Sequence, residues 1–141
     1  MLTEPIEAPD EISPEALLDR YQAELARVVT AVGRERVLEA TDLDAAAVDA
    51  VESGDAADLD VRDAAAILAL REGAPDAETI LAEVRDHLLL SMTGAMLTVD
   101  RVAADVEGDL DPKEVQGMVE GRHPMTLAEY ARIHHFVASA K

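Results

Sequence analysis

The side chains that could bind a metal ion or transfer a proton are few in this sequence, and their spacing argues against a shared site. His134 and His135 are the only neighbouring histidines. Adjacent residues on a helix point about 100° apart, so these two rings cannot bind one metal ion together. Glu83 and His87 have the i, i+4 spacing that brings two side chains to one helix face, but two ligands fit a surface hydrogen bond better than a metal site. We therefore expect no metal ion and no cofactor.

Acids and hydroxyl groups likewise lack the surroundings of a catalytic centre. Asp55, Asp58 and Asp60 crowd one loop, but the ligand order of a calcium loop is missing, and Asp60 is better explained as a helix N-cap. No serine lies in a nucleophile elbow, and there is no glycine-rich phosphate loop. The chain has no cysteine, and its aromatic residues are two tyrosines and one phenylalanine, too few for a platform that stacks single-stranded nucleic acid. We expect neither catalysis nor a small-molecule substrate.

The elements that position these residues are all predicted to be helices. Apolar residues recur at helical spacing along most of the chain, and no alternating run of strand length stands out. The widest apolar stripe, over about 76–95, predicts a central helix that is covered on several sides. Capping residues, first-turn prolines and stop glycines place the other boundaries. The predicted helices open at Ser13, Glu35, Asp44, Asp60, Asp76, Thr98, Asp111 and Thr126.

One stretch of the chain occurs twice. Apolar and glycine positions recur at the same spacing in both copies, with Leu43, Val48, Val51 and Gly54 matching Leu110, Val115, Met118 and Gly121. After one dropped residue the match continues, with Leu59, Val61 and Ile67 matching Met125, Leu127 and Ile133. Each half is predicted to contain a long helix, two short helices and a closing helix, which indicates internal duplication. We predict an all-α fold of two duplicated four-helix units with helix-turn-helix-like cores, packed as one compact domain.

These units set the predicted division of the chain. Residues 1–12 carry two prolines and four acids and are expected to form a mobile acidic tail. The first repeat covers 13–73, and the second covers 74–141. Gly54 and Gly121 are predicted to stop the second short helix of each repeat, in the left-handed conformation that glycine adopts at low cost.

A net charge of −18 dominates the composition. The acids are spread along the whole chain, Lys113 and Lys141 are the only lysines, and alanine and valine supply most of the apolar content. This pattern is typical of a halophilic surface, because a screening length of about 3 Å in molar salt suppresses repulsion between like charges. An acidic mimic of nucleic acid is the alternative. No apolar run reaches the ~18 residues of a membrane span and the first residues are acidic, so we expect a cytoplasmic protein with no membrane contact.

Segment 48–54 resembles the end of the helix-turn-helix in phage-repressor-like DNA-binding domains. That family ends its recognition helix with two aliphatic residues three apart, often an acid, and a glycine three residues beyond the second aliphatic. Val48, Val51, Glu52 and Gly54 fit this pattern, whereas in the second copy Val119 stands where the acid is expected. The other positions of the second copy fit, with Val115, Met118 and Gly121. The whole chain also resembles an uncharacterised haloarchaeal family of acidic proteins.

The helix-turn-helix resemblance implies that bases would be contacted from the start and outer face of the second short helix. In the first repeat this face carries acids, which repel phosphate, and alanines, which make no side-chain hydrogen bonds. Its residues are Asp44, Ala45, Ala46, Asp49 and Ala50. In the second repeat Lys113 and Arg122 could meet phosphates, and Gln116 could read adenine. The candidate contact residues for DNA or a protein partner are therefore Lys113, Gln116, Gly117, Arg122 and His123.

Two functions stay open. The first is a non-catalytic regulatory or adaptor protein that uses the helix-turn-helix scaffold to bind another protein or itself, through apolar surface left exposed between the halves. The second is a DNA-binding transcriptional regulator that works through the second repeat. The charge around Lys113, Gln116 and Arg122 separates them, because a continuous basic patch favours DNA. A patch interrupted by acids favours protein, and the acids available there are Asp111, Glu114 and Glu120.

Overall fold

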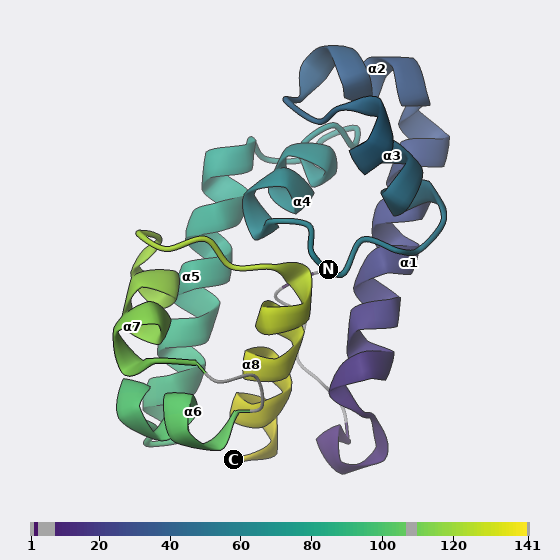
Figure 1. Cartoon of the computed structure of the whole chain (residues 1–141). Helices are drawn as coiled ribbons and strands as arrows, with labels where there is room; N and C mark the ends of the chain where they lie inside the picture. The colour runs from purple at the N-terminus through teal and green to yellow at the C-terminus, as the bar shows by residue number, and fades with distance from the viewer. Residues whose placement is uncertain (1, 3–7, 107–109, 141) are drawn as a thin grey trace.

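The chain folds into helices throughout the part that the structure, a computed structural model, describes: residue 2, residues 8–106 and residues 110–140 (Figure 1). Its elements are the 3-10 helix η1 (Pro9–Glu11) and the α-helices α1 (Pro14–Val32), α2 (Arg34–Ala40), α3 (Ala45–Glu52), α4 (Val61–Leu68), α5 (Ala77–Gly94), α6 (Val99–Asp105), α7 (Pro112–Glu120) and α8 (Leu127–Ser139). Within these described ranges no strand is formed, and the β-type pairing is an isolated antiparallel bridge between Asp60 and Thr126. The prediction of an all-α fold is confirmed.

Most of these helices begin at a polar residue that the sequence marks as a helix start. In seven α-helices the side chain before the first turn accepts a hydrogen bond from a backbone N–H of that turn, and these caps are Ser13, Asp44, Asp60, Asp76, Thr98, Asp111 and Thr126. Thr126 and Glu129 form a capping box, because each side chain accepts from the backbone N–H of the other residue. The caps satisfy backbone donors that have no partner inside the helix.

A single residue separates α1 from α2. Gly33 donates its N–H to the carbonyl of Val29 in α1 at 2.8 Å, and its own carbonyl accepts from the N–H of Val37 in α2 at 3.2 Å. Its φ of 100° lies where residues with a side chain are rarely found. The chain can therefore leave one helix and enter the next without a loop.

The two long helices frame the molecule. α1 and α5 run in opposite directions along its two sides, and α4 and α8 lie between them (Figure 1). The short pair α2–α3 lies toward the C-terminal end of α1, and the short pair α6–α7 lies toward the C-terminal end of α5. Buried side chains from all eight α-helices join one hydrophobic core.

The closing helix of each half packs against the long helix of the other half. α8 makes its most extensive contact with α1, and α4 makes its most extensive contact with α5. Where α4 and α8 begin, Val61 donates its N–H to the carbonyl of Met125 at 2.8 Å. Leu127 donates its N–H to the carbonyl of Leu59, also at 2.8 Å. The sequence repeat matches Leu59 with Met125 and Val61 with Leu127, so the two hydrogen bonds are equivalent in the two halves. That the whole halves superpose stays a prediction.

Residues near the N-terminus that the structure describes contact the last helix, and the mobility of the tail stays a prediction. Leu2 is 2% exposed, and its carbonyl oxygen accepts a hydrogen bond from the Tyr130 hydroxyl. Helix η1 packs against α8, where His135 donates from Nε2 to the carbonyl of Ile12 at 2.6 Å. The side chain of Leu2 belongs to the core, and that of Ile12 is partly buried against it. Residues 1 and 3–7 of the predicted tail lie outside the described residues.

Candidate contact surface of the second half

Helix α7 is a short amphipathic helix that carries Lys113 and Gln116 on its outer face, and Arg122 and His123 follow its end. Asp111 caps it by accepting from the N–H of Lys113 at 2.7 Å. Val115, Met118 and Val119 are at most 2% exposed and fix the inner face to the core. This leaves Lys113 exposed, and Gln116 partly so, on the opposite face.

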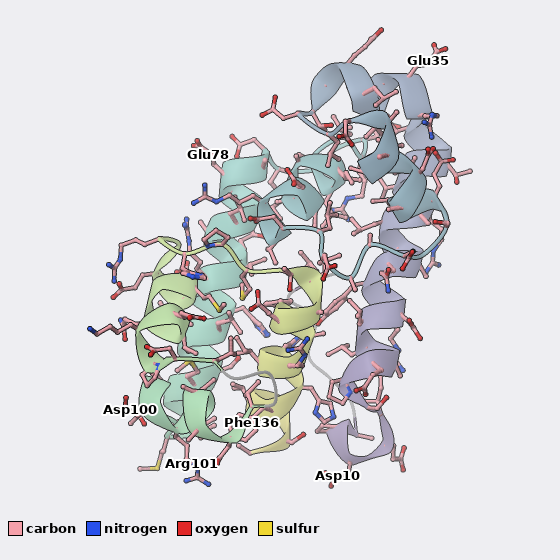
Figure 2. The ribbon with its side chains drawn as sticks, in the orientation of Figure 1. Asp10, Glu35, Glu78, Asp100, Arg101 and Phe136 are labelled. Carbon is pink, nitrogen blue, oxygen red and sulfur yellow. The ribbon has the colours of Figure 1, made fainter. Side chains whose placement is uncertain are left out.

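Three of the five candidate residues line one hollow. Lys113, Gln116 and Arg122 surround a shallow depression of about 490 Å³, together with Val99, Asp100 and Pro112. Asp100 is in the first turn of α6 and is labelled in Figure 2. The depression therefore mixes cations with an acid and with apolar surface.

Glu120 binds two of the three candidate side chains in the depression, Gln116 and Arg122. Its carboxylate accepts from Nε2 of Gln116 at 2.5 Å and also binds the guanidinium of Arg122. The Arg122 guanidinium, followed by the Gln116 amide, lowers the pKa of Glu120 below its ordinary value. Among the described residues that line the depression, Lys113 is the cation with no carboxylate bound to it. The basic patch is thus interrupted, at one of the acids that the sequence singled out.

Gly117 lies within α7 and His123 lies in the turn that follows it, and neither lines the depression. The carbonyl of Gly117 accepts from the N–H groups of Arg122 and His123, at 2.7 and 3.1 Å. A Cβ atom on Gly117 would lie 2.8 Å from Cβ of His123, which is too close for any other residue type. Gly117 is therefore buried for the close approach of this turn, and it offers no side chain to a ligand.

Gly121 ends α7 and is covered by arginines from two other helices. Its φ of 78° is in the left-handed region, and Gly54 at the end of α3 has a φ of 74°. A Cβ atom on Gly121 would lie 2.0 Å from a terminal nitrogen of Arg85 in α5. Arg62, in α4, donates to the carbonyl of Gly121 at 3.0 Å. Cations at a helix C-terminus interact favourably with its partial negative charge, so these arginines hold the end of α7 in place.

Arg62 and Arg85 were missed by the sequence reasoning, which looked within the second short helix and the residues just after it. Arg62 lies in the other half of the chain, and Arg85 lies on the long helix. No local spacing relates either of them to Gly121. Only the packing of α4 and α5 around the end of α7 brings them to Gly121.

The corresponding face of the first half is acidic. Asp44 caps α3, and Asp49 and Glu52 both bind the guanidinium of Arg34, with the Glu52 contact at 2.8 Å. The hydrogen bond to Asp49, followed by the one to Glu52, raises the pKa of Arg34. This cation is therefore engaged within the protein, and the outer face of α3 offers no basic side chain to a phosphate.

The neighbouring residues His134 and His135 contact separate partners. Nδ1 of His134 lies 2.5 Å from the Tyr21 hydroxyl, and its Nε2 lies 3.0 Å from Nε2 of His87. One imidazole in that pair must donate and the other accept. His135 instead binds the carbonyl of Ile12. In the described part of the chain, no three or more His, Asp or Glu residues are arranged to hold a metal ion.

Comparison with known proteins gives one match. A family described as a family of unknown function (DUF5791) matches residues 17–140, which span α1 to α8. No curated protein and no solved structure matches the chain. None of the helices in the described ranges is both long enough and apolar enough to cross a lipid bilayer.

Proposed function

Because the chain belongs to this family of unknown function, DUF5791, its role has to follow from its own residues, and we propose that it is a non-catalytic regulatory or adaptor protein that binds another protein or itself. The observation that carries this proposal is the pairing of Glu120 with Gln116 and Arg122. Base readout needs free amide and guanidinium groups, and phosphate contact needs an uninterrupted basic surface. A carboxylate in the middle of the candidate face opposes both.

Exposed apolar side chains also support protein binding. Leu89, Leu90 and Met96 are the large apolar residues that the described surface exposes, at 42%, 73% and 91%. They lie at the C-terminal end of α5 and just beyond it, and not in the region between the halves where the sequence led us to expect a partner surface. Met96 also has a φ of 58°, a left-handed conformation that costs a residue with a side chain about 1 kcal/mol. A methionine there adds nothing to the core and fits a contact surface.

DNA binding through the second half is the alternative, because Lys113, Gln116 and Arg122 do share one depression. The two functions differ in what Glu120 does. In a DNA-binding regulator Glu120 would restrain the reading residues, and its removal would strengthen binding. In a protein-binding molecule the same change would leave DNA affinity negligible.

A DNA pull-down from fragmented genomic DNA in molar KCl tests this difference. The wild-type protein is compared with Lys113→Glu, Gln116→Ala and Glu120→Gln. The control is Glu114→Gln, which removes a charge from the same helix. We expect no enriched motif and no duplex binding tighter than ~1 µM, a limit weaker than specific binders usually show. Enrichment of one short motif, lost in the first two variants and strengthened by Glu120→Gln, would establish the DNA-binding alternative instead.

Protein binding is tested by crosslinking in the same salt. A photo-crosslinker placed at Thr93, beside the exposed leucines, should capture a protein in wild type. Leu90→Glu should abolish the adduct, while Ala46→Glu, which adds the same charge on the outer face of α3, should not. Equal adducts from both variants would rule out the α5 end as the binding surface.

A further inference from the structure

The C-terminal end of α1 borders a groove with a basic rim. Its volume is about 500 Å³, and its lining comes from α1, α2 and the residues that follow α4. The floor is apolar, formed by Val28, Ala31, Val32 and Leu70. The rim holds Arg27, Arg36, Arg71 and Glu72. Three cations and one acid line it, which reverses the balance of 30 acids and 12 lysines and arginines in the whole chain.

Two of the rim arginines are available to an anionic partner. Arg27 is bound to Glu24 at 2.9 Å, but neither Arg36 nor Arg71 forms an ion pair with a carboxylate of the described residues. Arg71 is an exposed residue whose Nε donates to the carbonyl of Leu68 at 2.8 Å. The groove therefore fits an apolar group that is flanked by acids.

The same chain carries such a group at the end of α5. Leu90 and Met96 are exposed, and acids flank them on both sides. Asp86 lies one helical turn before Leu90, and Asp100 lies four residues after Met96. Both acids are exposed, and neither forms an ion pair within the described residues.

One copy cannot place its own α5 end in its own groove. α1 and α5 run in opposite directions, so their C-terminal ends lie at opposite ends of the molecule (Figure 1). The groove borders the first of these ends, and Leu90 is in the last turns of α5. Figure 2 labels a residue at each of those ends, Glu35 in α2 and Asp100 in α6. Only a second molecule can bring the two surfaces together.

We propose that the partner is a second copy of this chain, whose α5 end, Leu90 and Met96, enters the basic-rimmed groove at the end of α1. This inference rests on the proposed function and names its partner. The apolar side chains cover the groove floor, while Asp86 and Asp100 meet Arg36 and Arg71. Burial of apolar surface drives the contact, and the charges select its orientation.

The geometry of this contact lets the assembly grow beyond two copies. Each copy uses a different surface toward each neighbour, and the two surfaces face opposite ends of the molecule. A head-to-tail contact of this kind repeats along a chain of copies unless its rotation closes a ring. Association should also need salt, because two molecules of charge −18 repel each other over long distances until the charges are screened.

Sedimentation equilibrium in molar KCl tests the inference. Wild type should show an average mass that rises with protein concentration beyond two chains. Leu90→Glu blocks the inserted end, and the double variant Arg36→Glu with Arg71→Glu blocks the groove, so each should sediment as one chain. An equimolar mixture of these two variants retains one working groove and one working α5 end, and should form a dimer that grows no further. Ala46→Glu and Arg20→Glu serve as controls with similar charge changes and should behave as wild type.

The outcomes separate the inference from the proposed function. Wild type that stays a single chain, or a mixture of the two blocked variants that stays unassociated, overturns the second copy as partner. If the Thr93 crosslinker then still captures a different protein in wild type and loses it in Leu90→Glu, protein binding at the α5 end stands with another partner. Circular dichroism of each variant should match wild type, since all substituted side chains are at the surface.

Discussion

At the end of α7, Gly121 meets two requirements at once. Its φ of 78° is costly for other residue types, and the space that a side chain would fill holds the guanidinium of Arg85. Gly54 has the same conformation at the end of α3, but a Cβ atom there would meet nothing within 4 Å. A side chain at Gly54 would therefore meet backbone strain alone, whereas a side chain at Gly121 would meet backbone strain and a steric clash with Arg85.

Gly121→Val should cost more free energy of unfolding than Gly54→Val. Backbone strain costs each variant about 1 kcal/mol, and displacement of Arg85 adds to this only at Gly121. Urea unfolding in molar KCl measures both losses, and Arg85→Ala should remove the excess from the Gly121 variant. Equal losses at the two positions would mean that Arg85 moves aside at no cost.

Glu120 should titrate below the ordinary range of a glutamate. The Arg122 guanidinium lowers its pKa, so the pair stabilises the fold at neutral pH, and this contribution is lost as the pH falls through the lowered pKa. Carboxyl-carbon NMR follows the titration directly. Arg122→Gln should move the midpoint upward, and by more than Gln116→Ala does, because the arginine contact is the larger cause. An unchanged midpoint for Glu120 in Arg122→Gln would show that the ion pair does not persist in solution.

At the scale of elements, the sequence predicted helix boundaries better than helix partners. Residues such as Asp60 and Thr126 mark helix starts through local hydrogen bonds, so reading neighbours along the chain was sufficient. Apolar spacing shows which face of α8 is buried, but it carries no information on which helix covers that face. The contact of α8 with α1 was therefore not predicted. The α1 groove and the arginines over Gly121 escaped prediction for the same reason, because separate elements assemble them.

Separated halves should fold together but not alone. In each half the closing helix has its main partner in the other half, so an isolated fragment would leave that apolar face in water. Fragments 1–75 and 76–141 should each show little helix by circular dichroism and regain it when mixed. A cooperative melt from either fragment alone would contradict the exchange of closing helices.

At the scale of the whole molecule, charge is the strongest determinant of stability that the sequence offers. The excess of 18 negative charges is spread along the chain, and the ion pairs among the described residues, such as Arg27 with Glu24, are exposed and contribute little. Self-repulsion in the folded state then depends on the surrounding salt.

Stability should rise steeply between dilute buffer and molar KCl. Screening shortens the reach of each charge to about 3 Å at 1 M, which removes most of the repulsion that compaction creates. Thermal melting at a series of KCl concentrations measures the effect, with an equal concentration of uncharged osmolyte as the control. An unchanged melting temperature would exclude adaptation to high salt.

The pairing of the first long helix with the last helix bears on how the chain is made. Tyr21 reaches His134 across 113 residues, and Tyr130 reaches Leu2 across 128. Contacts between such distant segments form slowly, because a long loop must close before they stabilise anything. During synthesis the apolar face of α1 therefore leaves the ribosome well before α8 exists to cover it. We therefore expect chaperones to bind nascent α1 and to release it only after α8 has emerged.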